Sequence, residues 1–147
     1  MPLSTRELFA RMIKCEAEGE GDIGMKAVAS VIMNRVHVPY GEYLTLNQGD
    51  LRRVLFQPYQ FTCAMEQVAN EYNAQNIYNM RPDEIHYEIA DWALSGSTLN
   101  ATANSLWYYN PFDPTCAKYF PRTLTGALYN QISEHCFYIP TAKYAQT

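Results

Sequence analysis

Apolar residues recur at helical spacing near the start of the chain and predict two helices. Ser4 and Glu7 form a capping box ahead of the first apolar stripe. A run of glycines and acids predicts that this helix ends near Gly19, and Asp22 is expected to cap the second helix. The two stripes are Leu8, Phe9, Met12 and Ile13, then Ala27, Val28, Val31, Ile32 and Arg35 or Val36.

The middle of the chain is less regular. Residues 40–50 have the composition of a polar loop, and a short helix is expected over residues 51–55. Residues 57–61 predict an irregular loop rich in aromatic side chains, because Pro58 removes a backbone donor. Pro82 and the acids after it predict another helix. Its stripe and the glycine that ends it are Ile85, Ile89, Trp92, Ala93 and Gly96.

Strand-forming residues are concentrated in the last third. Residues 105–110 are rich in Trp and Tyr, and residues 123–139 suit one or two short strands. Helices first and a few strands late indicate an α+β fold rather than a parallel α/β sheet. The 147 residues fit one domain, 1–147, because no repeat or linker divides them.

Composition and charge narrow the possible partners. The net charge is −4 and no basic patch is present, so neither nucleic acid nor an anionic membrane surface is expected as a partner. No apolar run approaches the about 20 residues of a membrane span, and the N-terminus lacks the pattern of a secretory signal. Twelve tyrosines raise the aromatic content to 14%, which suits both half-wet cores and sugar-binding clefts.

The four cysteines, at positions 15, 63, 116 and 136, show no C-x-x-C or zinc-finger spacing. We therefore expect neither a metal nor a cofactor. The spacing favours free thiols that are buried or half-buried.

Glu16 is the most informative residue, because it continues the apolar stripe of the first helix. Partial desolvation there would raise the pKa of its carboxyl and favour the neutral acid. A glycosidase needs that form to protonate the leaving oxygen of the glycosidic bond. The alternative is a helix that ends one residue earlier and leaves Glu16 in solvent. Glu18 should be solvated, whereas Glu20 could turn inward or cap the next helix.

Four ordered blocks of sequence resemble one known family. They are Cys15-Glu-Ala-Glu-Gly-Glu-Gly-Asp-Ile-Gly-Met with Val31-Ile-Met-Asn-Arg-Val36, Phe56-Gln-Pro-Tyr-Gln-Phe61, Ser105-Leu-Trp-Tyr-Tyr109, and His135-Cys-Phe-Tyr-Ile-Pro140. Together they are similar to the spore cortex-lytic cell wall hydrolases of the SleB/CwlJ type, and the last two blocks look closest to the CwlJ branch. The resemblance spans nearly the whole chain.

The resemblance implies a lysozyme-like single domain related to lytic transglycosylases, mainly helical with a small late sheet. It implies action on the glycan strands of spore cortex, which carry muramic-δ-lactam, during germination. The family's catalytic acid falls on Glu16. Members of the CwlJ branch lack a signal peptide and are associated with the spore coat. A location in the coat or cortex and a spore-coat protein partner are therefore expected.

The expected substrate bond joins N-acetylmuramic acid to N-acetylglucosamine. A hydrolytic mechanism normally uses two carboxylates, whereas a lytic transglycosylase needs one. A single convincing acid favours the transglycosylase, with a hydrolytic muramidase, a non-catalytic glycan- or coat-binding module and a peptide-cleaving enzyme as alternatives. His135 is more often structural than catalytic in such a pattern. The substrate-binding candidates are Gln57, Tyr59, Phe61, Trp107, Tyr108, Tyr109 and Asn110.

Overall fold

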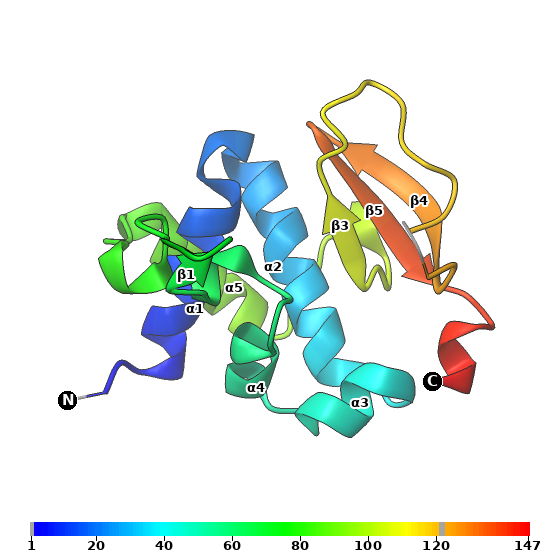
Figure 1. Ribbon diagram of the computed structural model, residues 1–147, viewed down its shortest axis with the longest axis horizontal. Helices are drawn as coiled ribbons and strands as arrows, with labels where there is room; N and C mark the ends of the chain where they lie inside the picture. The colour runs from blue at the N-terminus through cyan, green and yellow to red at the C-terminus, as the bar shows by residue number, and fades with distance from the viewer. Residues whose placement is uncertain (1, 121–122) are drawn as a thin grey trace.

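Helix α2, Gly21–His37, lies between the other helices and a small β-sheet (Figure 1). The computed structural model describes residues 2–120 and 123–147. The helices around α2 are α1 (Thr5–Ala17), α3 (Gly41–Asn47), α4 (Leu51–Phe56) and α5 (Glu84–Leu94). The predicted helices over 51–55 and after Pro82 are therefore confirmed.

The junction between α1 and α2 determines where the acid of the first helix stands. Ser4 Oγ accepts a hydrogen bond from the Glu7 amide at 3.1 Å and begins α1, as the capping pattern predicts. The helix ends at Ala17, and one 3-10 turn, Glu18–Glu20, connects it to α2. The predicted end near Gly19 is confirmed, although Glu20 rather than Asp22 occupies the N-cap position of α2.

The late sheet has three antiparallel strands in the order β3-β5-β4. They are β3 (Trp107–Tyr109), β4 (Gly126–Ile132) and β5 (His135–Pro140). A separate small hairpin, β1 (Gln67–Val68) with β2 (Glu71–Tyr72), lies on the helical side of the molecule. The predicted α+β class, mainly helical with a small late sheet, is confirmed.

The core consists of a helical cluster and an aromatic cluster under the sheet. Buried residues of α1, α2, α4 and α5 form the first. The second joins the sheet to α3 and the C-terminus through Tyr43, Trp107, Tyr138 and Tyr144. Phe137 of β5 packs against α2 and connects the two halves. The site described below lies where these halves meet.

The expectation of a polar loop over residues 40–50 is wrong, because α3 occupies most of that segment. The polar composition of this segment gave no indication that Tyr43 anchors the helix in the core. Tyr43 is buried against Tyr144 and Trp107, which lie far away in the sequence. Its amide also donates to the Tyr144 hydroxyl at 3.1 Å.

The expectation of free thiols is also wrong. Cys15 is bonded to Cys63 and Cys116 to Cys136. Sequence spacing could not indicate these pairs, because only the packing of α1 on the loop after α4, and of the loop after β3 on β5, brings the sulfurs together. Within the described ranges, no helix is long and apolar enough to cross a membrane.

Candidate active site

Glu16 stands in the last turn of α1 and lines a cavity of about 230 Å³. Burial raises the pKa of its carboxyl to about 7, and the nearby Arg35 guanidinium offsets part of that rise. The alternative of a helix that ends earlier and leaves Glu16 in solvent is therefore wrong. Near neutral pH a large share of the carboxyl carries a proton, which is the form that a general acid requires.

Arg35 of α2 is the buried cation of the cavity. Its Nε donates to the Leu106 carbonyl at 2.7 Å and its Nη1 to Gln60 Oε1 at 3.2 Å. The guanidinium lies over the rings of Tyr43 and Phe61, 4.8 and 5.2 Å from their centroids. These contacts hold the positive charge in place, so it can stabilise an anion at Glu16 without moving.

Residues from five separate segments line the cavity. α1 and α2 supply one residue each, the loop after α4 supplies three, and the β3 end and the start of β5 form the opposite side. The lining residues are Glu16, Arg35, Gln60, Phe61, Thr62, Tyr108, Tyr109, Asn110 and His135.

The Tyr108 hydroxyl is buried and has no hydrogen-bond partner among the described residues. Burial raises the pKa of Tyr108 well above its ordinary value, and the charge of Glu16 raises it further. The Tyr108 phenol therefore stays neutral and can donate a hydrogen bond near Glu16. An unpaired buried hydroxyl is costly, so a substrate oxygen or the Glu16 carboxylate is a fitting acceptor.

Glu20 and His135 form a second polar pair at the same cavity, with Oε1 and Nδ1 3.3 Å apart. Burial lowers the pKa of His135, while Glu20 and Glu134 act in the opposite direction. Gly24 makes room for this arrangement, because a Cβ there would lie 2.3 Å from Glu20 Cβ. Glu20 thus turns inward, one of the two orientations that its place after Gly19 allows.

The two disulfides bracket the cavity. Cys15 directly precedes Glu16, and its partner Cys63 directly follows Thr62. On the other side Cys136 follows His135 and is bonded to Cys116 in the loop after β3. Backbone on both sides of the cavity is therefore fixed covalently.

Some of the predicted substrate-binding residues line the cavity around Glu16, and the others lie elsewhere. Phe61, Tyr108, Tyr109 and Asn110 line the cavity together with Glu16. Trp107 is only 6% exposed and packs in the aromatic core, on the face of β3 opposite to Tyr108.

Gln57 and Tyr59 lie apart from this cavity. Gln57 accepts a hydrogen bond from Asn47 at 2.9 Å and lines another hollow near α4. Tyr59 is 86% exposed and has a positive φ of 65°. Glu18, expected in solvent, is exposed.

Sequence reasoning did not assign Arg35, Gln60 or Thr62 to the site. Arg35 carried a usable signal, since it continues the apolar stripe of α2 just as Glu16 continues that of α1. Gln60 and Thr62 lie in an irregular loop that gives no such signal. The described residues contain no group of three His, Cys, Asp or Glu side chains that could hold a metal ion.

A protonatable glutamate between a helical lobe and a small sheet, beside aromatic and amide side chains, is the arrangement of the lysozyme-like class of fold. Residues 19–138 match the Cell Wall Hydrolase family, and the chain belongs to this family of enzymes that act on peptidoglycan. The matched range begins after Glu16, so the argument for that residue rests on its geometry.

Curated relatives and solved structures agree with this assignment. The chain is 28% identical to the cell wall hydrolase CwlJ of Bacillus subtilis, over 93% of this chain and 86% of that protein. It is 30% identical to CwlJ of Oceanobacillus iheyensis, over 92% and 86%. The catalytic domain of the germination-specific lytic transglycosylase SleB from Bacillus anthracis has a TM-score of 0.67 and 25% identity, over 94% of this chain and 96% of that one. The SleB catalytic domain of Bacillus cereus gives 0.66 and 27%, over 91% and 88%. The predicted lysozyme-like fold is thereby confirmed.

Proposed function

We propose that the protein cleaves the bond between N-acetylmuramic acid and N-acetylglucosamine in spore cortex during germination, as a single-glutamate lytic transglycosylase. The observation that carries this proposal is the half-buried Glu16, whose pKa of about 7 leaves it able to give and then take a proton. The description of the SleB neighbour as a germination-specific lytic transglycosylase supports the same setting.

In the proposed reaction the Glu16 carboxyl donates its proton to the glycosidic oxygen, and the bond from that oxygen to C1 of the muramic sugar breaks. The departing N-acetylglucosamine keeps the proton as a hydroxyl. The C6 hydroxyl of the muramic sugar then attacks C1 and returns its own proton to the Glu16 carboxylate. No water is consumed, and the product carries a 1,6-anhydro ring.

The surroundings of Glu16 favour the charge that appears between these two steps. While Glu16 is an anion, the fixed Arg35 guanidinium stabilises it. The unpaired Tyr108 hydroxyl can donate to the carboxylate or to the sugar. Phe61 and Tyr109 offer ring surface to the substrate, and Asn110 offers an amide for its polar groups.

One observation favours a hydrolytic muramidase as a second candidate. His135 lines the cavity beside Glu20, so this pair could activate a water molecule for attack on C1. Against it, Glu20 is engaged by His135 and is not a free carboxylate of the kind that glycosidases pair with their acid. A location in the spore coat or cortex and a spore-coat protein partner remain predictions.

The products decide between the two reactions. Purified spore cortex digested with the protein should yield muropeptides with 1,6-anhydromuramic ends, which mass spectrometry distinguishes from reducing ends by the mass of one water. Reducing ends alone would replace the transglycosylase by the muramidase. Unchanged glycan strands would leave only the non-catalytic module or a peptide-cleaving enzyme.

A further inference from the structure

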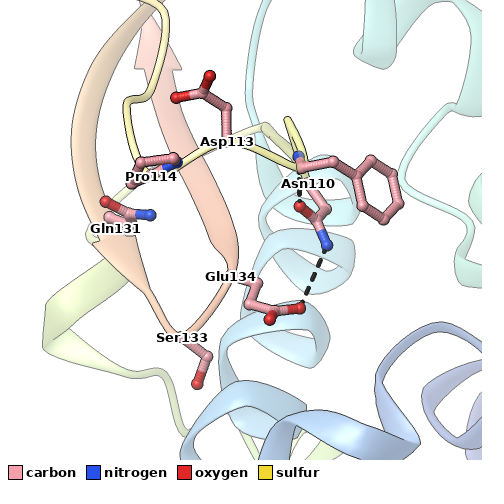
Figure 2. A pocket seen from close by; sticks show the side chains of 7 residues that line it. Asn110, Asp113, Pro114, Gln131, Ser133 and Glu134 are labelled. Carbon is pink, nitrogen blue, oxygen red and sulfur yellow. Dashed lines mark hydrogen bonds between the residues drawn. The ribbon is translucent and has the colours of Figure 1, made fainter.

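A second hollow, of about 490 Å³, adjoins the active-site cavity. Asn110 lines both, so the two lie next to each other at the end of β3. One side of the hollow is the loop after β3, and the other is the turn between β4 and β5 (Figure 2). Its size is that of ordinary ligand sites, and no step of the proposed reaction uses it.

Phe112 lines this hollow and exposes its aromatic ring to solvent. The side chain is 91% exposed, and the backbone has a φ of 53°, a left-handed conformation that a bulky residue adopts at a cost. Asn110 holds it there, since Asn110 Oδ1 accepts from the Phe112 amide at 2.7 Å. Neither burial nor backbone preference accounts for this position.

The loop that carries Phe112 is held in one conformation. Pro111 and Pro114 restrict the backbone on either side of the ring. Asp113 Oδ1 accepts from the Thr115 amide at 2.8 Å, and the Cys116–Cys136 disulfide joins the loop to β5. A ring fixed in advance loses little entropy when a ligand stacks on it.

The polar lining of the hollow identifies the class of ligand. Asp113 and Glu134 contribute carboxylates, Gln131 an amide and Ser133 a hydroxyl, and among the residues that the structure describes neither Lys nor Arg lines it. Carboxylates accept hydrogen bonds from sugar hydroxyls and repel anions. An amide can pair with an acetamido group, and the flat ring fits the apolar face of a pyranose.

We propose that this hollow is a subsite for an uncharged N-acetylated hexose of the glycan strand whose cleaved bond lies beside Glu16. The subsite rests on the proposed function, because the strand reaches the hollow past Asn110. Phe112 stacks on the sugar, Gln131 and Glu134 bind its polar groups, and the two carboxylates exclude sugars with a free acid.

Triacetylchitotriose, an uncharged oligomer of N-acetylglucosamine, is a suitable probe for calorimetric titration. Phe112→Ala should weaken its binding about tenfold, the scale expected from one lost ring contact. On purified cortex the same variant should raise KM with kcat unchanged. Tyr72→Ala, which removes an exposed ring from the distant β1–β2 hairpin, is the matched control and should bind like the wild type.

Three outcomes would overturn the subsite. One is a Phe112→Ala protein that is folded and binds the probe like the wild type. Another is equal binding of a hyaluronan tetrasaccharide, which carries carboxylates on alternate sugars. The third is binding of a peptidoglycan stem tetrapeptide, but not of the sugar, in a manner that depends on Phe112. If the wild type cleaves cortex and Phe112→Ala changes neither probe binding nor KM, the subsite is refuted and the proposed function stands. Absence of cleavage by the wild type means that the proposed function fails.

Discussion

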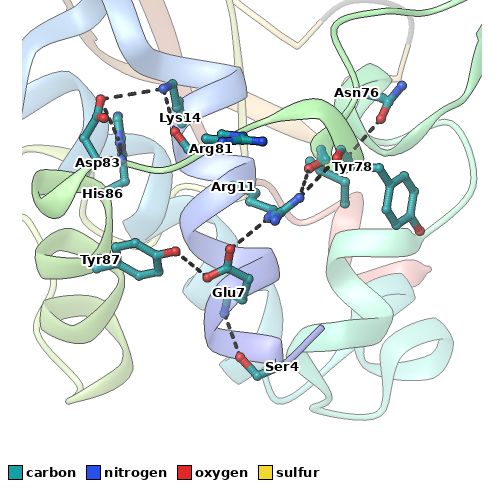
Figure 3. Close-up of polar contacts among 11 residues, drawn as sticks. Ser4, Glu7, Arg11, Lys14, Asn76, Tyr78, Arg81, Asp83, His86 and Tyr87 are labelled. Atoms are coloured by element: carbon teal, nitrogen blue, oxygen red, sulfur yellow. Dashed lines mark hydrogen bonds and ion pairs between the residues drawn. The ribbon is translucent and has the colours of Figure 1, made fainter. Parts of the chain in front are cut away.

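Helix α1 carries a half-buried glutamate at each end, and their environments have opposite effects. At the start, Glu7 accepts hydrogen bonds from the Tyr87 hydroxyl at 2.5 Å and from Arg11 Nε at 3.0 Å (Figure 3). The Tyr87 bond is the main cause of a lowered pKa for Glu7. At the other end, burial raises the pKa of Glu16 to about 7, and no hydrogen bond to its carboxylate is formed within the described chain.

Burial alone therefore does not decide what a glutamate on a helix does. Glu7 lies where hydrogen-bond donors surround the carboxylate, so the ion is satisfied and joins α1 to α5. Glu16 lies where the chain turns away and leaves a cavity. Among the described residues, the charge that lowers the pKa of Glu16 is that of the Arg35 guanidinium. The first arrangement favours stability and the second favours proton transfer.

The largest expected effect is a difference in activity between Glu16→Gln and Glu7→Gln. Glu16→Gln keeps the shape but cannot donate a proton, and general acid–base catalysis typically contributes about 10²–10⁴-fold. Glu7→Gln should release soluble fragments from cortex at close to the wild-type rate. Circular dichroism establishes that both are folded, and Glu18→Gln is a second control from the exposed side of the same helix end. A folded Glu16→Gln protein with near wild-type activity would refute the assignment and direct attention to Glu20.

The same two variants should change stability in opposite directions. The pKa of Glu16 rises from 4.5 to about 7 on folding, so its ionisation costs stability progressively above pH 4.5, reaching roughly 3 kcal/mol above pH 7. Glu16→Gln should therefore be more stable than the wild type at pH 8 and no more stable at pH 4.

Glu7→Gln should instead lose about 1–3 kcal/mol at pH 8, because a charge-assisted network is weakened. Its pKa is lowered in the fold, so this loss should shrink as the pH falls through that pKa. Urea unfolding at pH 4 and pH 8 measures the difference in free energy of unfolding between each of the two variants and the wild type. A Glu16→Gln protein destabilised at pH 8 would show that the carboxylate is satisfied after all.

The smallest expected effect is a shift in the pH profile. Activity should decline above a pH of about 7, because the protonated form of Glu16 is lost. Arg35 lowers that pKa, so Arg35→Met should move the decline to higher pH, whereas Arg35→Lys should move it less. Initial rates between pH 5 and 9, each divided by the folded fraction, give the midpoints. Identical midpoints in all three proteins would exclude the guanidinium as a cause.

Sequence pattern was sufficient where a local signal coincides with a fold-level role. The Ser4 N-cap, the stripes of α1, α2 and α5, and the late aromatic strand all follow from short-range spacing, although Glu7 does not close the predicted capping box because its carboxylate binds Arg11 and Tyr87. Glu16 was visible as a carboxylate on an apolar stripe. The family resemblance gave the lysozyme-like architecture, which spacing could not.

The missing parts depend on contacts between distant segments. The helix α3 requires Tyr144 from the other end of the chain, and the disulfides require two packed elements each. The pleat of β3 places Trp107 and Tyr108 on opposite faces, although both were expected in one cleft. Arg35 shows that a cation on an apolar helical stripe, like a carboxylate there, indicates a residue of the site.

The placement of the two disulfides has a chemical consequence for the enzyme. Each joins a residue next to a cavity residue, Glu16 or His135, to a segment distant in the sequence. Disulfides typically contribute about 2–4 kcal/mol, mainly by restricting the unfolded chain. A thiol reductant would thus loosen the chain beside the acid and the histidine without occupying a sugar site. Loss of activity under reducing conditions would therefore be independent of the substrate concentration.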